Sequence, residues 1–481
     1  MGTAAGLALY ALLLAAAAAV VWRRPVAALY LFVVGLALHN ATMAALYAAG
    51  LRGSALTAVT AWKEILLGVA LASVGTEAVR ARRLPFRPGA VDALALAFAA
   101  LVVVYALIPQ SALDGEAGRK AIWLAARHDL VPVGAFFLGR SLALRGPDLR
   151  RLAWTLAGTA AAVAAIGLVD VYAVSISWWR TNGVVAYFHD HLGYDYHGTG
   201  GLPENFVYNV GGDEPFLRRL VSTFLSPLAS GYLFVVALLV AAAALRRRLV
   251  VPLALVVAAG LLWTFSRSSL VALAVGLVVL ALVRRRPLWV AAAAATIGIA
   301  IGWAHAFPSI APTGRWTQAD LAYQHRFARE HPGADPSSAT SQNEPSIRSH
   351  LTSLRDGFET LTEHPQGYGL GNVGQTASRT GTPLKAGESN YTELGVELGV
   401  LGALLWLAWV LAILWGLLRA RSLFAPAFAA VLALAVQTDV IGDPWVAYCV
   451  WALGGALLVV RRQDAPERQY LRDQASATMP A

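Results

Sequence analysis

Two arginines, Arg219 and Arg267, stand at the ends of apolar segments and have no acidic residue beside them. A guanidinium keeps its charge and presents a planar fork of N–H donors, which matches the oxygens of a phosphate. Two such side chains that face one cavity at the edge of a membrane would bind an anionic ligand. This pattern predicts a site for a pyrophosphate that is carried on a lipid.

A stretch of nine residues, HDHLGYDYH, holds residue types that often bind metals at close spacing. Its candidate ligands are His189, Asp190, His191, Asp195 and His197. No second cluster elsewhere in the chain completes a known metal-binding pattern, so a solvated polar loop is favoured over a metal site.

Four glycines in the stretch GYGLGNVG at residues 367–374 look like a phosphate-binding loop. Such a loop needs a preceding strand and a following Lys and Ser/Thr, and neither is present. The stretch therefore favours a sharp turn that re-enters toward the membrane.

Ionisable residues also lie inside apolar segments, at Lys63 and Glu64 and at Arg127, His128 and Asp129. Each costs roughly 2.5–3.5 kcal/mol on insertion into a membrane, so such residues indicate function unless they are paired. Structural ion pairs between helices, Lys63–Glu64 and Arg127–Asp129, are the alternative interpretation.

The composition places these residues in a membrane protein. Of 481 residues, 57% are hydrophobic and only 14% are charged, which is too few charges to coat a soluble surface. The net charge of +10 comes largely from arginine runs between apolar blocks, which indicates topology signals and argues against nucleic-acid binding. The single cysteine, Cys449, excludes an intramolecular disulfide.

Thirteen apolar blocks of helical length follow one another along the chain. They cover approximately residues 3–21, 26–50, 56–79, 90–108, 121–139, 152–174, 220–245, 249–265, 268–283, 287–306, 391–418, 423–438 and 444–460. Basic clusters fall in every second connection, at residues 23–24, 80–87, 140–151, 246–248, 284–286, 419–421 and 461–462. The positive-inside rule places these connections in the cytoplasm. The sequence therefore predicts an all-α polytopic transmembrane bundle of about 12–14 helices with its amino terminus outside.

Two long connections remain for the opposite side of the membrane, at residues 175–219 and 308–389. We expect these extracytoplasmic loops to carry function, because loops of this length are seldom simple turns. Apolar residues at three- and four-residue spacing predict an amphipathic helix at residues 345–364. A single transmembrane domain would span residues 1–462, and residues 463–481 would form a cytoplasmic tail.

The first long loop is rich in aromatic residues, whose faces could stack on sugars. An ordinary interfacial belt of aromatic side chains is the alternative interpretation. The residues are Trp178, Trp179, Tyr187, Phe188, Tyr194 and Tyr196.

Four stretches, taken in order, carry a resemblance to a known family. They are RRLVSTFLSPLASGYL from Arg218, TFSRSSLVAL from Thr264, IRSHLTSLRDGFETLTEHPQGYGLGN from Ile347 and ESNYTELGVELGVLGALLWL from Glu388. Together they resemble the bacterial O-antigen polymerase and O-antigen ligase superfamily. Its members move a glycan from undecaprenyl pyrophosphate to an acceptor on the outer face of the cytoplasmic membrane.

The resemblance implies roles for particular residues. Arg219, Arg267 and Arg348 take the places of family arginines and would stabilise the charge that grows on the leaving pyrophosphate, in place of a metal. The acceptor hydroxyl needs a base, and Glu388 is the first candidate. His350 and Asp439 are the reserve candidates and would otherwise bind substrate.

The implied reaction is a metal-independent, inverting glycosyl transfer that needs no cofactor. Glu388 stands in the region where ligases carry a histidine, so polymerisation of lipid-linked repeat units is favoured over ligase-type transfer. A lipid-linked-oligosaccharide flippase or another transporter is the alternative from a different class. The expected partners are the undecaprenyl-pyrophosphate-linked donor and acceptor, membrane lipid and a chain-length regulator. The expected location is the bacterial cytoplasmic membrane, with the site facing the periplasm.

Overall fold

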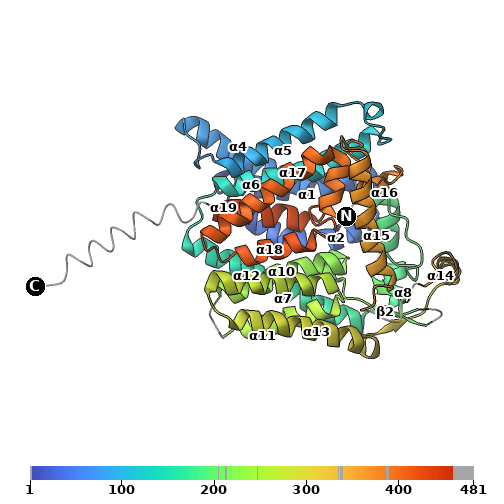
Figure 1. The fold of residues 1–481 in the computed structure, drawn as a ribbon. Coiled ribbons are helices and arrows are strands. Elements are labelled where there is room, and N and C mark those ends of the chain that lie inside the picture. Colours follow the sequence, from blue (N-terminus) through green and yellow to red (C-terminus); the bar gives the residue numbers. More distant parts are fainter. Residues whose placement is uncertain are drawn as a thin grey trace, which may run out of the picture.

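The computed structural model describes residues 3–203, 205–211, 214–245, 248–333, 335, 340–385 and 389–458. The fold is 74% helical with almost no sheet. Long apolar helices lie side by side in one bundle, and shorter elements gather at one end of it (Figure 1).

All thirteen apolar blocks of the sequence coincide with helices. The helices are α1 (Thr3–Arg23), α2 (Ala27–Ala48), α3 (Gly53–Thr60), α4 (Trp62–Ala81), α5 (Ala90–Leu107), α6 (Arg119–Ser141), α7 (Gly146–Ala173), α10 (Pro227–Ala244), α11 (Val250–Trp263), α12 (Arg267–Arg284), α13 (Leu288–Ile310), α17 (Asn390–Arg419), α18 (Ala425–Leu434), and η4 (Val446–Val450) with α19 (Trp451–Leu457). Within the described residues, nine helices are long and apolar enough to cross a membrane. The number rises to ten if α3 and α4, which meet at a bend of 40°, count as one span. The apolar helices α11, α18 and η4–α19 are shorter, so the finer count of 12–14 spans is not established.

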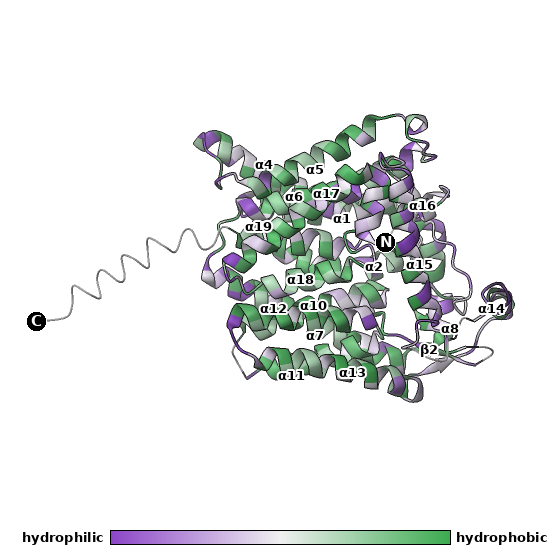
Figure 2. Cartoon of the chain, viewed as in Figure 1, coloured by the Kyte–Doolittle hydropathy of each residue, from purple (hydrophilic) through white to green (hydrophobic). Residues whose placement is uncertain are grey.

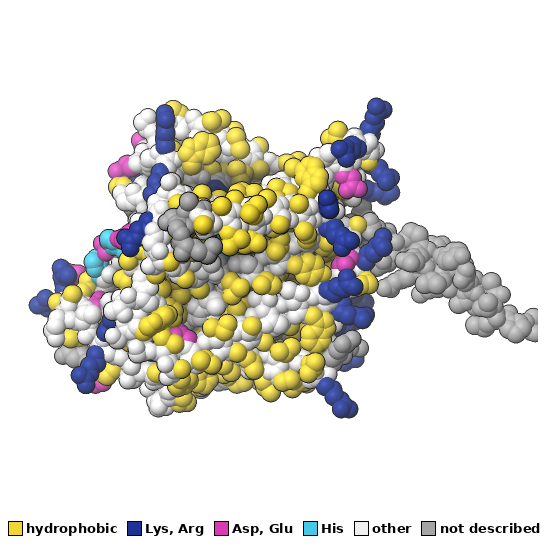
Figure 3. Space-filling view, turned by 180° about the vertical axis from the view of Figure 1, so that it is seen from behind, with side chains coloured by type: hydrophobic (Ala, Val, Ile, Leu, Met, Phe, Trp, Pro, Cys, Tyr) yellow, Lys and Arg dark blue, Asp and Glu magenta, His cyan; other side chains and the backbone are white. Residues whose placement is uncertain are grey.

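The two ends of the bundle differ in their charged residues. The last turns of α1, α4, α6, α12 and α17 each carry an arginine. Figure 3 shows Lys and Arg mixed with Asp, Glu and His along the left edge, and a dense row of Lys and Arg side chains along the right edge, beyond a broad apolar belt. Figure 2 shows the same pattern along the helices, hydrophobic in their middle parts and hydrophilic at their ends. We call this edge the arginine end and the opposite edge the loop end.

Both long connections lie at the loop end and form ordered structure there. The elements outside the bundle helices are η1 (Gln110–Ala112), α8 (Ile176–Thr181), α9 (Val184–Ala186), η2 (Tyr187–Leu192), β1 (Val207–Tyr208), β2 (Phe216–Arg218), η3 (Ser222–Phe224), β3 (Thr313–Gly314), α14 (Gln318–Glu330), α15 (Pro345–Glu363) and α16 (Gly374–Thr380). The predicted amphipathic helix is confirmed as α15.

A small sheet lies at the loop end of the otherwise helical fold. Its three antiparallel strands follow the order β1-β2-β3. Strand β2 comes from the first long connection and pairs with β3 from the second, with Phe216 opposite Gly314. The sheet therefore ties the two connections together.

Small residues allow two helices of the core to approach closely. At Gly139 in α6, an added Cβ would collide with the carbonyl of Ala452, and at Gly455 in α19 it would collide with the carbonyl of Phe136. Close backbone approach at small residues is a common way for membrane helices to pack, because van der Waals contact replaces the hydrophobic driving force there. The contact between α6 and α19 matters for function, since α6 also carries His128.

This contact predicts an effect on stability. Gly139→Ala should destabilise the bundle by about 1–3 kcal/mol, because an added methyl group in a tight core forces a backbone shift. Thermal unfolding of the purified protein in detergent measures the loss. Gly158→Ala in α7 is the matched control, since an added Cβ there meets nothing within 4 Å. Equal melting temperatures for both variants would contradict the close packing.

Candidate functional site

Arg219 is buried at the loop end, directly after strand β2. Its backbone N–H donates to the carbonyl of Phe206, which fixes the chain as it turns into the bundle. The guanidinium Nε donates to the carbonyl of Thr264 at 2.8 Å, and Nη1 lies 3.4 Å from Asn205 Oδ1. Among the described residues, no carboxylate lies within ion-pair distance of Arg219. A buried cation is thus held by neutral oxygens only.

Arg267 is the first residue of α12, three positions after the Thr264 carbonyl that binds Arg219. The turn between α11 and α12 ends at Ser266, whose hydroxyl caps α12 by accepting from the Ser269 N–H. Arg267 Nη2 donates to Glu344 Oε2 at 2.9 Å, and its guanidinium lies 5.7 Å from the ring centre of Tyr208. The short turn therefore brings both predicted arginines to one place.

The two arginines influence each other electrostatically. Burial and the nearby Arg267 cation lower the pKa of Arg219 to about 10. The oxygens of Tyr208, Glu344 and Tyr232 oppose this shift with smaller effects. Burial, followed by the Glu344 charge, raises the pKa of Tyr208 to about 12. We call Arg219, Arg267, Tyr208 and Glu344 together the arginine site, because they form one connected group of charges.

The neighbouring arginine, Arg218, is also buried, but it forms an ion pair within the protein. Its Nη2 lies 3.5 Å from Asp170 Oδ1, and its Nη1 donates to the carbonyls of Val171 and Val174. Asp170 also accepts from the indole N–H of Trp179 at 2.8 Å. Arg218 therefore has a carboxylate partner within ion-pair distance, whereas Arg219 has none among the described residues.

Glu344 is a member of the arginine site that sequence reasoning did not identify. It is the N-cap residue of α15, and its Oε2 accepts from the Ile347 N–H at 2.9 Å. The Tyr208 hydroxyl lies 3.4 Å from Oε1. One buried carboxylate thus caps a helix and binds Arg267 at once. Ser, Thr, Asp and Asn are the preferred N-cap residues, so a glutamate before Pro345 does not by itself indicate a capping residue or a member of the arginine site.

Two other predicted site residues lie on α15. Arg348 is exposed, and His350 is half-buried two positions further along the helix. Glu388, the first candidate base, lies outside the described residues. The sequence prediction therefore stands as a proposal for Arg348, His350 and Glu388.

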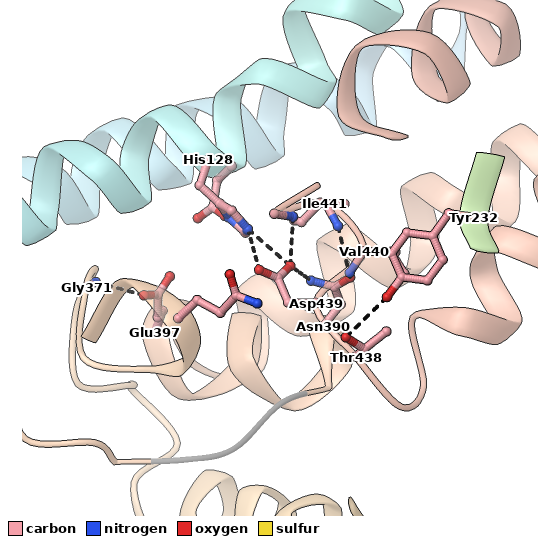
Figure 4. A network of polar contacts seen from close by, with 12 residues as sticks. His128, Tyr232, Gly371, Asn390, Glu397, Thr438, Asp439, Val440 and Ile441 are labelled. Carbon is pink, nitrogen blue, oxygen red and sulfur yellow. Dashed lines mark hydrogen bonds and ion pairs between the residues drawn. The ribbon is translucent and has the colours of Figure 1, made fainter. Parts of the chain in front are cut away.

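Asp439, the other reserve candidate, lies in a second polar cluster, which Figure 4 shows. His128 Nε2 lies 2.9 Å from Asp439 Oδ2, and His128 Nδ1 lies 2.8 Å from Asp129 Oδ1. The amide of Asn390 donates to Asp439 Oδ1 at 2.6 Å, while its carbonyl oxygen accepts from the Val440 N–H at 2.7 Å. The start of α17 and the connection after α18 are thereby fixed around Asp439.

A break in α17 adds a further carboxylate to this cluster. Gly399 has φ +69, a left-handed conformation that interrupts the helix, and the carbonyl of Glu397 then accepts from the Gly369 N–H. The Glu397 side chain accepts from the Gly371 N–H at 2.7 Å. The glycine-rich stretch is therefore a tight turn packed against the broken helix.

These groups line one cavity, which we call the carboxylate pocket. Its lining residues are Ala125, His128, Asp129, Val373, Gly374, Gln375, Thr376, Asn390, Glu393, Leu394, Glu397 and Asp439. Tyr232 of α10 lies between this pocket and the arginine site. Its hydroxyl is 3.5 Å from Thr438 Oγ1, next to Asp439 (Figure 4), and the same side chain is among the groups that influence the pKa of Arg219.

The remaining predicted clusters have other partners. Glu64 lies 3.6 Å from Lys63 Nζ and 3.3 Å from Arg127 Nη1, which confirms the first ion pair. Asp129 binds His128, so the predicted Arg127–Asp129 pair is wrong.

The stretch HDHLGYDYH was the candidate metal site, and in it Asp190 accepts from the Tyr47 hydroxyl at 2.5 Å. Among the described residues, no group of three His, Cys, Asp or Glu side chains has metal-binding geometry.

The fold defines a multi-pass membrane protein with two polar clusters at one end of the bundle. Comparison with known families gives a more specific result. Residues 252–407, about a third of the chain, match the model of a family described as O-antigen ligase. The resemblance to the O-antigen polymerase and ligase superfamily, in which glycan-processing membrane enzymes are grouped, is thereby confirmed. A search of curated proteins finds no match to this chain.

The role of Glu344 leads to a prediction about α15. Glu344→Ala removes the cap and should weaken the first turn of the helix by about 1 kcal/mol, which corresponds to about fivefold faster amide exchange at Ile347. Hydrogen exchange followed by mass spectrometry measures the change. Glu359→Ala, an exposed residue on the same helix that pairs with Arg355, is the control and should leave that turn unchanged. Unaltered exchange in Glu344→Ala would contradict the capping role.

Proposed function

We propose that this protein is a glycosyltransferase that polymerises undecaprenyl-pyrophosphate-linked oligosaccharide repeat units on the outer face of a bacterial cytoplasmic membrane. The loop end would face away from the cytoplasm, as the positive-inside rule predicts for the arginine end. One observation supports this proposal most strongly. Within the described residues, Arg219 is a buried cation with no carboxylate at ion-pair distance, beside a second arginine, and a pyrophosphate would supply a compensating negative charge.

The proposed reaction is a single inverting displacement. A hydroxyl oxygen of the acceptor sugar attacks the anomeric carbon of the donor, and the bond from that carbon to the pyrophosphate oxygen breaks. The hydroxyl proton goes to a base of the protein, and undecaprenyl pyrophosphate leaves. Arg219 and Arg267 would stabilise the charge that develops on the leaving group, with Arg348 as a third contributor.

The base is proposed to come from the opposite side of the reacting carbon. Glu388 remains the first candidate from the sequence. Of the two reserves, Asp439 is supported by its position in the carboxylate pocket, which adjoins the arginine site through Tyr232 and Thr438. An acceptor hydroxyl in that pocket would lie between Asp439 and the bound donor.

Ligase-type transfer is the second candidate, because the matching family model is described as O-antigen ligase. The two activities give different products from a lipid-linked oligosaccharide. Polymerisation of lipid-linked repeats yields a ladder of lengths without any other acceptor, whereas a ligase yields a single product and only when a separate acceptor is added. We expect the ladder, since Glu388 replaces the histidine that is typical of ligases.

The arginine pair gives the sharpest mutational prediction. Arg219→Ala and Arg267→Ala should each lower turnover on the order of a hundredfold to a thousandfold, or about 3–4 kcal/mol, because each removes a preorganised donor to the leaving group. Arg219→Lys and Arg267→Lys should also be damaging, since lysine keeps the charge but loses the fork. Product formation from a defined lipid-linked donor measures the effect.

Arg52→Ala is the matched control for these variants. Arg52 is an exposed arginine whose guanidinium lies over the Tyr47 ring at 4.6 Å, away from the arginine site. It should retain normal turnover. Near-normal turnover in both folded Arg219→Ala and folded Arg267→Ala would refute the proposed role of the pair.

A further inference from the structure

Glu344 forms an ion pair with Arg267 inside the proposed diphosphate site. Its Oε2 lies 2.9 Å from Arg267 Nη2, and only 4% of the Glu344 side chain is exposed. Two opposite charges at this distance attract each other strongly where little water screens them. A phosphate oxygen that binds Nη2 must therefore replace the Glu344 carboxylate.

Other contacts keep Glu344 beside the site when a phosphate replaces it. Oε2 also accepts from the Ile347 N–H at 2.9 Å, and the Tyr208 hydroxyl lies 3.4 Å from Oε1. Further along α15, Gly357 packs on Thr392 of α17 so closely that an added Cβ would lie 2.7 Å from the Thr392 Cβ. The helix thus holds a negative charge next to the place where a diphosphate would bind, and the two repel each other.

The two arginines of the site differ in this respect. Arg219 is held by the Thr264 carbonyl and by Asn205 Oδ1, and in the described parts of the chain it has no carboxylate at ion-pair distance. A phosphate at Arg219 therefore replaces neutral oxygens, whereas a phosphate at Arg267 competes with a carboxylate. The competition falls on one arginine of the pair.

The chemistry of the leaving group gives this competition a use. In the donor, the terminal phosphate is esterified to a sugar, whereas in undecaprenyl pyrophosphate it is free and ionises a second time near neutral pH. Two arginines that stabilise the growing charge would bind this product more tightly than the donor. Slow release of a tightly bound product limits turnover in many enzymes.

We infer that Glu344 weakens the binding of the leaving undecaprenyl pyrophosphate at the arginine site and thereby speeds its release. This inference rests on the proposed function and deepens it, since it assigns a residue to the step that follows transfer. Glu344 binds Arg267 in the empty site, is replaced by the diphosphate, and binds Arg267 again as the product leaves. It acts through Arg267 and is therefore a positioning residue.

Binding of a product analogue to Glu344→Gln tests the inference. Glutamine can still accept from the Ile347 N–H and from Arg267, but it has no negative charge. The full-length protein in lipid nanodiscs is titrated with geranyl pyrophosphate, a short-chain diphosphate that dissolves in water. We expect about tenfold tighter binding to Glu344→Gln than to the wild type, mainly through slower dissociation. Unchanged or weaker binding, the result of a purely structural role, would overturn the inference.

Transfer kinetics separate product release from chemistry. With a lipid-linked donor, Glu344→Gln should complete its first turnover at least as fast as the wild type and then run more slowly, so that kcat and the KM for the donor fall together. Glu359→Gln, an exposed residue of α15 that pairs with Arg355, is the control and should match the wild type in binding and turnover. A slower first turnover, or a steady-state rate equal to that of the wild type, would overturn the inference.

The same titration distinguishes this inference from the proposed function. Arg219→Ala should bind geranyl pyrophosphate more weakly than the wild type, because it lacks one guanidinium of the site. If it does so while Glu344→Gln is unchanged, the arginine site stands and only the inference about release is wrong. If Arg219→Ala and Arg267→Ala both bind as tightly as the wild type, the diphosphate lies elsewhere and the proposed function is wrong as well.

Discussion

Arg219 is buried and, in the part of the chain that the structure describes, has no carboxylate within ion-pair distance, and the rest of the proposed site depends on this constraint. Removing a cation from water costs several kcal/mol unless an anion compensates it. The fold supplies such an anion to other buried arginines, as Asp92 at 2.7 Å from Arg140 and Asp170 at 3.5 Å from Arg218 show. Arg219 has no such partner within ion-pair distance among the described residues, and this difference is the basis for proposing it as part of a ligand site.

The arrangement around Arg219 separates groups of opposite charge. The arginine site holds two guanidinium groups, and the carboxylate pocket is lined by four carboxyl side chains. In the proposed reaction, the first would stabilise the leaving pyrophosphate and the second would accept the hydroxyl proton. Tyr232 and Thr438 lie between them. The sheet that joins β2 to β3, together with the cap that Glu344 forms on α15, holds the two long connections in place around this boundary.

The sequence predicted the helices well, because their apolar blocks are long and arginine runs separate them. It also predicted that Arg219 and Arg267 share one site, and the structure places them near each other, while their binding of phosphate stays a prediction. Partnerships over long distances along the chain were not predictable: His128 and Asp439 are 311 positions apart. Residues two positions apart do not face each other on a helix, which explains why Arg127 pairs with Glu64 instead of Asp129. Strands of two or three residues are too short to show an alternating pattern.

The most direct test of the central claim is the position of a bound pyrophosphate. A cryo-EM structure of the full-length protein in nanodiscs with undecaprenyl pyrophosphate would show it. The account predicts that phosphate oxygens lie about 2.7–2.9 Å from guanidinium nitrogens of both Arg219 and Arg267. A diphosphate bound elsewhere, with Arg219 still held only by the Thr264 carbonyl and Asn205, would contradict it.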